Sequence, residues 1–501
     1  MRKYLIGIDV GTTAIKTIIF DASTYRIIVT ENASHDLSSR MVGWAEESPE
    51  DWWQNIIKTI KVCLEKSKIN PRDVAGIGVS GMVPAFIQLG AQGEILRPSI
   101  QQNDARTFHE IEIMEREIGA EHFFGITGCT LNQQMIGPKI LWMKRNEPEI
   151  FARTKKMMGS YDYVVYKLTG NFSLERNWAL ESGLYDVHSE YWSEELLRYV
   201  GIDRSFLPPI HKPSDVVGSV SAKAAVETGL CLGTPVVAGT ADHVSSAFMA
   251  GIQNDGDLLI KLGGAGDILY STNTLITDHR LFIDYHVIPG KFLLNGCMAS
   301  SGSILKWYVK DVLGKEITDY AALDQEAEHI PTGSDGIVLL PYFIGEKTPI
   351  FDPLARGVIF GLTLHHNKYH IYRAIMEAVG YGFLHHIVTL REIGFQPQRV
   401  VVTNGGAISR TWGRIISNIT GYSLHYLKEN PGSSLGAAFI AGMGCGCFND
   451  WAEAQDLIQI IDIVYPDSVE HTRYQKLYKI YGDLYTDLKD DFIHLYDAIA
   501  Q

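Results

Sequence analysis

Residues 4–20 read YLIGIDVGTTAIKTIIF, two β-branched runs joined by the small-residue turn Gly11-Thr12-Thr13. Such a pattern predicts a β-hairpin. About half a chain later, residues 258–272 read LLIKLGGAGDILYST, which again places an apolar run, a glycine-rich turn at Gly263-Gly264 and a second apolar run in series. Two similar units predict a duplicated architecture with a boundary close to residue 250, and two unrelated hairpins are the alternative.

Strand and helix patterns alternate outward from the first hairpin. Apolar runs at residues 74–79 and 234–238 predict further strands. Ser48-Pro49 offers an N-cap and a first-turn proline, and apolar residues at helical spacing follow as far as Leu64. Alternation of this kind predicts an α/β fold. The 501 residues have room for two or three domains, and we expect two, residues 1–250 and 251–501.

The composition argues against several classes of protein. Lys and Arg number 44 against 58 Asp and Glu, a net charge of −14, and no long basic run interrupts that balance, so nucleic acid is not an expected partner. No apolar run approaches the roughly 20 residues that span a bilayer. The six cysteines match neither a disulfide framework nor a zinc knuckle. We therefore expect a soluble cytoplasmic protein with reduced thiols and no membrane partner.

The first hairpin turn has the residues needed to bind phosphate. Asp9 stands at the end of an apolar run, and Thr12 and Thr13 can turn amide and hydroxyl donors towards an anion. A carboxylate beside such a cradle suits the Mg²⁺ that accompanies a nucleotide's phosphates. An Asp that caps a plain hairpin is the alternative. Gly263 and Gly264 would let the second turn approach another part of the same phosphate tail.

Two further strand ends carry candidate residues. Gly405-Gly406 follows the apolar run at residues 400–403 and predicts a contact with a nucleobase or ribose, with a structural turn as the alternative. Asp242 lies at the expected N-terminus of a helix, whose dipole favours the ionised carboxylate. An ionised Asp there can accept the proton of a hydroxyl that attacks a γ-phosphate. An N-cap is the alternative role for Asp242, and His243 would line the pocket.

Two segments are candidates for binding a hydroxyl-rich substrate. Asn103 and Asp104 follow an apolar segment that ends at Ile100, and they precede a polar helix pattern. Met82 and Val83 follow the predicted strand at residues 74–79 and could supply an apolar wall with exposed backbone. Either segment could equally be a surface loop.

In their order along the chain, these segments resemble the FGGY carbohydrate kinase family, and within it the xylulokinase-like branch, from about residue 4 to residue 450. The matching segments are GIDVGTT (7–13), GWAEESPEDWW (43–53), GPKILWMKRNEPEIF (137–151), GTADH (239–243), PYFIGEKTPIFDPLARGVIFGLT (341–363), TNGGAISR (403–410) and PGSSLGAAFIAG (431–442). The resemblance implies the actin-like ATPase fold, two ribonuclease-H-like domains flanking a central cleft. It also implies ATP and Mg²⁺ as cofactors, a small-molecule sugar or polyol as substrate, and a homodimer as the common assembly.

The resemblance also implies a role for each candidate residue. Asp242 would be the catalytic base, and Asp9 would serve the metal. Residues near the nucleotide would be Thr12, Thr13, Gly263, Gly264, Gly405 and Gly406. Residues near the sugar would be Met82, Val83, Gln102, Asn103, Asp104, Gln134 and His243.

Several of these positions depart from the family pattern. Val83 stands where xylulokinases usually present a histidine, Gln102 where an aromatic residue is common, and Gln134 where glycerol-phosphorylating relatives place a tyrosine. Gly264-Ala265 replaces the usual Thr-Ser of the second phosphate turn. We expect phosphorylation of a terminal hydroxyl of a ketopentose, with D-xylulose first. Ribulose, a tetritol or a branched sugar are the alternatives within the family, and a nucleotide-switched binding protein without catalysis is the alternative outside it.

Overall fold

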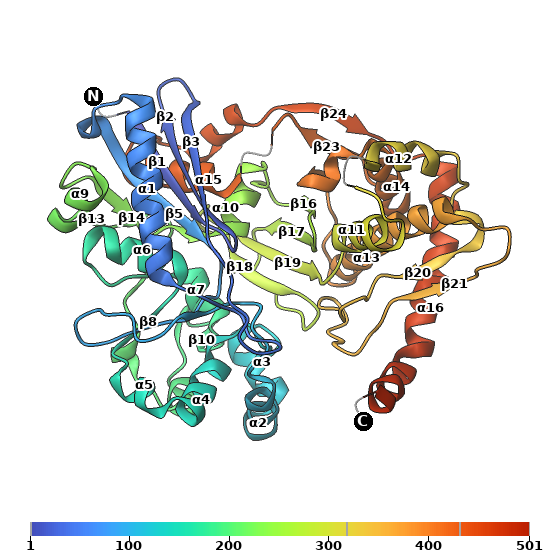
Figure 1. Ribbon diagram of the computed structural model, residues 1–501, viewed down its shortest axis with the longest axis horizontal. Helices are drawn as coiled ribbons and strands as arrows, with labels where there is room; N and C mark the ends of the chain where they lie inside the picture. Colours follow the sequence, from blue (N-terminus) through green and yellow to red (C-terminus); the bar gives the residue numbers. More distant parts are fainter. Residues whose placement is uncertain (1–2, 317–318, 430–431, 500–501) are drawn as a thin grey trace.

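The computed structural model describes residues 3–316, 319–429 and 432–499. Two seven-stranded sheets form the cores of two halves, which lie side by side in Figure 1. The first sheet runs β3 (Arg26–Ser34), β2 (Ala14–Asp21), β1 (Tyr4–Val10), β5 (Val74–Gly81), β14 (Pro235–Val237), β13 (Val216–Ser219), and β15 (Thr240–Ala241) also pairs with β5. The second runs β18 (Phe282–Tyr285), β19 (Phe292–Met298), β17 (Gly266–Thr272), β16 (Asp257–Leu262), β22 (Arg399–Thr403), β23 (Leu424–Leu427), β24 (Ile460–Val464).

Both predicted hairpins are present, and each occupies the same place in its sheet. β1 pairs antiparallel with β2, and β16 pairs antiparallel with β17. On its other side β1 pairs parallel with β5, just as β16 pairs parallel with β22. The order β3-β2-β1-β5-β14 therefore repeats as β19-β17-β16-β22-β23. This repeat confirms the predicted α/β fold with two sheet-centred domains, while the boundary at residue 250 stays a prediction.

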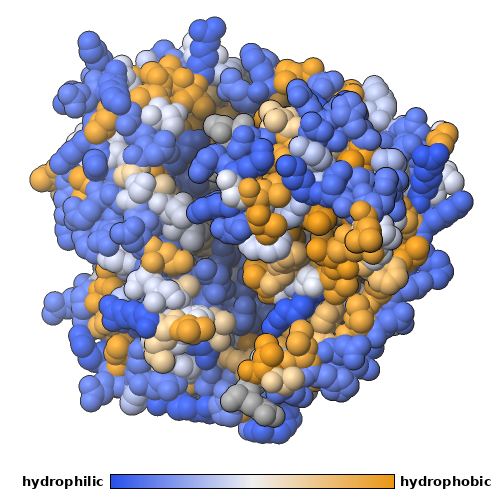
Figure 2. All heavy atoms as spheres, turned by 45° about the vertical axis from the view of Figure 1, so that its right-hand side comes forward, coloured by the Kyte–Doolittle hydropathy of each residue, from blue (hydrophilic) through white to orange (hydrophobic). Residues whose placement is uncertain are grey.

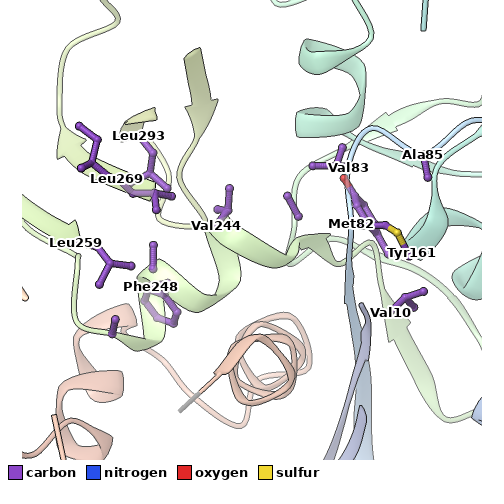
Figure 3. Packing of buried hydrophobic residues seen from close by; sticks show 14 of the residues in the cluster. Val10, Met82, Val83, Ala85, Tyr161, Val244, Phe248, Leu259, Leu269 and Leu293 are labelled. Carbon is purple, nitrogen blue, oxygen red and sulfur yellow. The ribbon is translucent and has the colours of Figure 1, made fainter. Parts of the chain in front are cut away.

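Two helices cross between the halves. α10 (Asp242–Met249) follows the first sheet in the chain, yet Figure 3 shows its Val244 and Phe248 turned towards Leu259 and Leu269 of the second sheet. α15 (Gly432–Gly444) lies in the chain between β23 and β24 of the second sheet, but it packs among the strands of the first sheet in Figure 1. The two helices also contact each other, since the Ser245 hydroxyl donates to the Ser433 carbonyl at 2.8 Å. Each half thus contributes one helix that packs towards the sheet of the other half.

The remaining helices are distributed over both halves of the molecule (Figure 1). Those of the first half are α1 (Pro49–Ser67), α2 (Phe108–Ile118), α3 (Ala120–Thr127), α4 (Ile136–Asn146), α5 (Pro148–Arg153), α6 (Ser160–Thr169), α7 (Arg176–Glu181), α8 (Glu194–Val200) and α9 (Ala222–Thr228). Those of the second half are α11 (Gly302–Trp307), α12 (Tyr320–Glu328), α13 (Lys368–Glu392), α14 (Arg410–Thr420) and α16 (Ser468–Ile499). Short strands lie outside the two large sheets: β4 (Glu46–Glu47), β6 (Ile87–Leu89), β7 (Ser99–Ile100), β8 (Lys156–Met158), β9 (Leu174–Glu175), β10 (Tyr185–Asp186), β11 (Tyr191–Trp192), β12 (Ile210–His211), β20 (Val338–Leu340) and β21 (Val358–Phe360).

The predicted helix start at Ser48-Pro49 is confirmed. Ser48 has extended backbone angles, and its side chain accepts a hydrogen bond from the Asp51 amide. The cap satisfies one of the amides that a helix start leaves without an internal partner. Within the described ranges, every helix is too short or too polar to cross a bilayer.

Candidate active site

The strand register of the first sheet brings two carboxylates to one edge. Asp9 of β1 lies opposite Ser80 of β5, and Ser80 in turn lies opposite Thr240 of β15. Asp242 begins α10 immediately after β15. The Ser80 hydroxyl donates to Asp9 Oδ1 at 2.9 Å, which fixes that carboxylate at the strand end. Asp9 and Asp242, far apart in the chain, therefore face the same space.

A cavity of about 280 Å³ opens at this edge, between the two halves. Figure 2 shows the surface hollowed between the two halves, with hydrophilic residues inside the hollow and both hydrophilic and hydrophobic residues on its rim. The first half contributes Val83, Pro84, Gln102, Asn103, Cys129, Asn132, Gln134, Met135, Glu181, Asp242 and His243 to the cavity wall. The second half contributes Lys261, Ala265, Asp267, Leu269, Phe282, Ile283, Asp284, Asn295, Cys297 and Lys347. The mixture of amides, charges and a few apolar walls suits a small polyhydroxylated ligand.

His243 links Asp242 to a carboxylate of the other half. Its Nδ1 lies 3.6 Å from Asp242 Oδ1, and its Nε2 lies 3.0 Å from Asp284 Oδ2. Burial opposes the charge on His243, but Asp284 and Asp242 outweigh it and raise the pKa of His243 well above its usual value. Glu181 lies against Asp284, and burial together with that neighbouring charge raises the pKa of Glu181. The cavity thus contains a protonated imidazole held between two carboxylates.

Asp242 is the carboxylate best placed to accept a proton. Burial alone would raise its pKa, but the hydrogen bond and charge of His243 and the charge of Lys261 hold the pKa of Asp242 below its usual value. Its side chain keeps 37% of its surface exposed to the cavity. Its place in the first turn of α10 adds the favourable field of the helix N-terminus. Asp242 is therefore ionised and accessible at neutral pH.

Asp9 has the opposite electrostatics. Burial and the negative charge of Asp242 raise the pKa of Asp9 to about 6. Hydrogen bonds from Ser433 and Ser80 and the charge of Lys16 oppose this rise. A nearby cation would relieve the repulsion between the two carboxylates, so the pair has the chemistry of a divalent-metal site.

The second hairpin carries a charge pair that mirrors the first. Asp9 and Lys16 are cross-strand partners beside the first turn, and Lys261 and Asp267 are cross-strand partners beside the second. Lys261 Nζ lies 3.6 Å from Asp267 Oδ2. The order of the two charges is reversed, so an acid from the first hairpin and a base from the second both reach the shared space. A phosphate group between the hairpins would meet a cation from one and a metal ligand from the other.

The glycine turns of the second sheet lie next to each other. Lys261 of β16 pairs with Thr403 of β22, so the turns after these strands are neighbours. A Cβ on Gly406 would lie 2.7 Å from the Leu262 Cβ, which leaves no room for a side chain. The carbonyls of Gly263 and Gly264 accept hydrogen bonds from the amides of residues 301–303. This packing keeps bare backbone at the strand ends, where a nucleotide could approach closely.

Comparison with known proteins agrees with this geometry. The N-terminal domain of the FGGY family of carbohydrate kinases matches residues 4–249, and the C-terminal domain of that family matches residues 264–445. The chain belongs to the FGGY family of carbohydrate kinases. The enzymes of this family use ATP as co-substrate, so the chain is a sugar kinase with a small-molecule substrate.

Full-length relatives extend the likeness of this FGGY kinase. It is 31% identical to the xylulose kinase of Bacillus subtilis (strain 168) over 97% of this chain and 98% of that one. The crystal structure of xylulose kinase from Rhodospirillum rubrum is similar at a TM-score of 0.92 and 38% identity, covering 98% of this chain and 100% of that one. The gluconate kinase of Lactobacillus acidophilus is similar at a TM-score of 0.93 and 25% identity, covering 98% and 99%. The fold is thus that of the FGGY kinases, as predicted.

Most of the predicted sugar-site residues of this FGGY kinase line one cavity. Val83, Gln102, Asn103, Gln134 and His243 lie in its wall together with Asp242. The residues predicted to lie near the nucleotide are not part of that wall. Ala265, the residue after Gly263 and Gly264, does line it. Thr12 and Thr13 form the open turn between β1 and β2.

Two predicted sugar-site residues lie elsewhere. Met82 is 1% exposed and turns towards Tyr161 behind the cavity wall in Figure 3. Asp104 is fully buried, accepts a hydrogen bond from the Ala45 amide at 2.6 Å and is paired with Arg106 at 2.7 Å. In this structure, therefore, Met82 and Asp104 do not reach the cavity. They act behind it, because a strand end and a buried ion pair put their neighbours Val83 and Asn103 in the wall.

Sequence reasoning missed a buried lysine that joins the two amide segments. Lys139 of α4 donates to the Gln101 carbonyl at 3.0 Å and to the Gln134 carbonyl at 2.8 Å. Burial lowers the pKa of Lys139 to about 7. One side chain thus fixes the two loops that present Gln102 and Gln134. Its position in the quoted segment GPKILWM was visible in the sequence, but its partners were not.

Sequence reasoning also missed most of the wall that comes from the second half. Lys261 and Asp267 could have been found from the hairpin repeat, because Lys261 precedes Gly263 by the same two positions by which Asp9 precedes Gly11. Glu181 and Asp284 carry no such signal, since one ends a short helix and the other lies in an edge strand.

Proposed function

We propose that this FGGY kinase transfers the γ-phosphoryl group of ATP to a terminal hydroxyl of D-xylulose. The observation that carries the proposal is an ionised, accessible Asp242 in a polyol-sized cavity between the two halves. The choice of sugar is supported by full-length relatives from Bacillus subtilis and Escherichia coli, which are named xylulose kinases. The cytoplasmic location and the homodimer remain proposals of the same kind.

Asp242 is the general base of the proposed reaction. The sugar hydroxyl would donate its proton to Asp242 while its oxygen bonds to the γ-phosphorus, and the bond from that phosphorus to the leaving oxygen of ADP breaks. The hydrogen bond and charge of His243 keep Asp242 ionised before transfer. Approach of the two halves would exclude water, which otherwise competes for the phosphoryl group.

The nucleotide would lie against the two hairpins. Mg²⁺ fits the carboxylate pair at the strand ends, with Asp9 serving the ion, and the ion would neutralise phosphate charge there. In the proposal the β- and γ-phosphates approach Thr12 and Thr13 from one side and Gly263 and Gly264 from the other. The adenosine approaches Gly405 and Gly406, where a Cβ has no room at position 406.

The sugar would be held by amide groups. Gln102, Asn103 and Gln134 line the cavity beside Asp242 and offer both donors and acceptors to vicinal hydroxyls. Amides discriminate between substrates because a missing hydroxyl leaves a buried polar group unpaired.

A substrate panel tests the proposal. Purified protein would be incubated with ATP and MgCl₂, and ADP release would be measured with D-xylulose, L-xylulose, D-ribulose, erythritol, gluconate and glycerol. We expect the highest kcat/KM with D-xylulose, and a product whose phosphate is on the terminal carbon by ³¹P NMR. A higher kcat/KM with another member of the panel would transfer the assignment to that sugar. Failure of every sugar to raise ADP release above the sugar-free rate would overturn the proposed reaction.

A further inference from the structure

A cluster of histidines and one aspartate lies on the second half, outside the active site. Asp335 lies in the short 3-10 turn Ser334–Gly336, His365 in the loop after β21, and His370 in the first turn of α13. His386, sixteen residues further along α13, lies 2.8 Å from the hydroxyl of Thr348, the residue after Lys347 of the cavity wall. At 1.5 Å per residue, the cluster is about 24 Å along the helix from that point. It therefore lies apart from the sugar cavity, whose lining includes none of its members.

The ligand atoms of the cluster already have the spacing of a metal site. His370 Nε2 lies 3.2 Å from Asp335 Oδ2, and His365 Nε2 lies 3.7 Å from the same oxygen. All three ligand atoms lie within 4.8 Å of one another. Ligands bound at about 2.0 to 2.1 Å in a tetrahedral zinc site are separated by roughly 3.3 Å. The three ligand atoms would therefore need to move only slightly closer together to bind an ion.

Hydrogen bonds orient His370 for such a role. Its Nδ1 lies 3.0 Å from Asn367 Oδ1, the side chain that caps α13. Nδ1 also accepts a hydrogen bond from the Asn367 amide at 3.3 Å, so in this arrangement Nε2 carries the proton and donates it to Asp335. An ion bound at Nε2 replaces that proton, and Nδ1 then carries the proton and donates it to Asn367 Oδ1. Histidines that bind metals usually have this kind of partner on their second nitrogen.

The turn that carries Asp335 is held equally firmly. Asp335 has a φ of 53°, in the left-handed region that only Gly, Asn and Asp adopt readily. The buried Glu377 accepts hydrogen bonds from the Gly333 amide at 3.0 Å and the Ser334 hydroxyl at 2.8 Å. Glu377 lies two turns after His370 on α13 and is itself paired with Arg373 at 2.9 Å. The carboxylate and the imidazole are therefore positioned by one helix before any ion binds.

We propose that Asp335, His365 and His370 form a site for a divalent transition-metal ion, with Zn²⁺ as the best-fitting ion. Two imidazoles and one carboxylate are ligands that Zn²⁺ prefers, and three protein ligands leave a fourth position for water. His365 is 77% exposed and His370 only 6%, so the ion enters from solvent and rests against the protein. The bound ion ties the loop at residues 361–367 to the 3-10 turn and to α13. Its role is structural, and the phosphoryl transfer does not pass through it.

Zinc titration of the metal-free full-length protein tests the site. Protein dialysed against EDTA and then freed of chelator would be titrated with ZnCl₂, and bound zinc would be measured by inductively coupled plasma mass spectrometry after desalting. We expect His365→Ala and Asp335→Asn each to bind one equivalent less than the wild type. Asparagine keeps the left-handed backbone of residue 335, so this variant removes the charge and leaves the turn.

A second measurement separates the site from other zinc ligands on the chain. We expect ZnCl₂ to raise the Tm of the wild type by several degrees and to leave the Tm of His365→Ala unchanged. His494, 76% exposed beside a single carboxylate, supplies the matched control, and His494→Ala should bind zinc and respond as the wild type does. Equal zinc binding by the wild type, His365→Ala and Asp335→Asn would overturn the proposal. So would a wild-type Tm that ZnCl₂ does not raise.

Discussion

Asp242 combines two properties that oppose each other in most carboxylates. It is accessible to a ligand, with 37% of its side chain exposed, and the hydrogen bond and charge of His243 offset its burial and lower its pKa. A proton acceptor in the transition state needs both, because the reacting hydroxyl must reach a carboxylate that is still ionised.

Replacing Asp242 by Asn tests this role. Asn has nearly the same shape but cannot accept the proton, so we expect Asp242→Asn to lower kcat by about 10² to 10⁴-fold. Nucleotide affinity should change little, measured by titration with a fluorescent ATP analogue. Asp487→Asn, an exposed change on α16, is the matched control and should keep wild-type kcat. A variant at 242 that keeps its kcat would favour a nucleotide-switched binding protein over a kinase.

His286 predicts how stability depends on pH. Its Nε2 donates to the Ile252 carbonyl at 2.7 Å, and its Nδ1 accepts from the Ile288 amide at 2.9 Å, so only the neutral ring satisfies both partners. Burial lowers the pKa of His286 to about 4 from an unfolded value of 6.5. The unfolded state therefore binds more protons between these values, and stability is lost as the pH falls from 6.5 towards 4.

Differential scanning calorimetry at pH 7 and pH 5 measures this loss. Each pH unit in that window costs about 1.4 kcal/mol for one such group. We expect His286→Gln to have a lower Tm at pH 7 but a smaller further drop at pH 5 than the wild type. His494→Gln, on the surface, should follow the wild type. If the Tm falls equally between pH 7 and pH 5 in all three proteins, His286 does not cause the loss of stability at low pH.

Single residues differ in how far the sequence could reveal them. Asp9 and Asp242 were predictable because each follows an apolar run, and strand ends are where parallel sheets gather their ligands. Met82 and Asp104 stay predictions as sugar-site residues, but their side chains are buried and their neighbours Val83 and Asn103 line the cavity. Both pairs lie just beyond a strand, where no regular alternation tells from the sequence which of two neighbours faces the cavity. Asp284 was not predictable, since only the folded chain brings it to His243 at 3.0 Å.

The packing of α15 against the first sheet requires glycine, which has no side chain, at two strand positions. Gly7 of β1 and Gly78 of β5 lie under α15, and a Cβ at either position would lie 1.9 Å from a carbonyl oxygen of that helix. That distance is far inside any van der Waals contact, and both partners are backbone, so neither can move alone. The glycines let α15 lie close to the sheet of the other half.

Gly78→Ala tests this close approach. We expect a Tm lower by several degrees or a failure to accumulate as soluble protein, because overpacking a filled core costs about 1 to 3 kcal/mol or more. Gly482→Ala is the matched control. A Cβ there meets nothing within 4 Å, and alanine favours the interior of α16, so the Tm should stay the same or rise. A Gly78→Ala protein as stable as Gly482→Ala would contradict the close packing of α15 on β5.

The hairpins and main helices were readable from the sequence, but the exchange of helices was not. Periodicity predicts that a segment is a helix and which face is apolar. It does not say which sheet receives that face, so α10 and α15 could not be assigned to opposite halves from residues 234–250 and 431–442 alone. The strand order could be anticipated only in so far as the two hairpins resemble each other.

The molecule consists of two halves with the same sheet topology. Their hairpins face each other and present groups of opposite charge. The repeated hairpins would present the same groups to the space between them if their sequences were identical. Instead Asp9 precedes the first turn and Lys261 precedes the second. A phosphate chain is anionic and its metal is cationic, so the two sides of the site need different charges, and the duplicated hairpins supply them.

Lys261 of the second half also acts on the base of the first half. Its charge lowers the pKa of Asp242, although the two residues belong to different sheets. Removing that charge in Lys261→Met should therefore raise the pKa of Asp242. A carboxylate with a higher pKa is protonated over a wider acidic range, so the acidic limb of the kcat/KM profile should move to higher pH. The variant's loss relative to the wild type should be larger at pH 5 than at pH 8.

The pH profile distinguishes this action from simple loss of nucleotide binding. Weaker ATP binding alone would lower kcat/KM by one factor at every pH and leave the limb in place. Lys476→Met, an exposed change on α16, controls for removing a positive charge and should keep both the rate and the limb. If Lys261→Met and the wild type give parallel profiles, the base of one half titrates independently of the other. The site would then depend on both halves for binding but on only one for its chemistry.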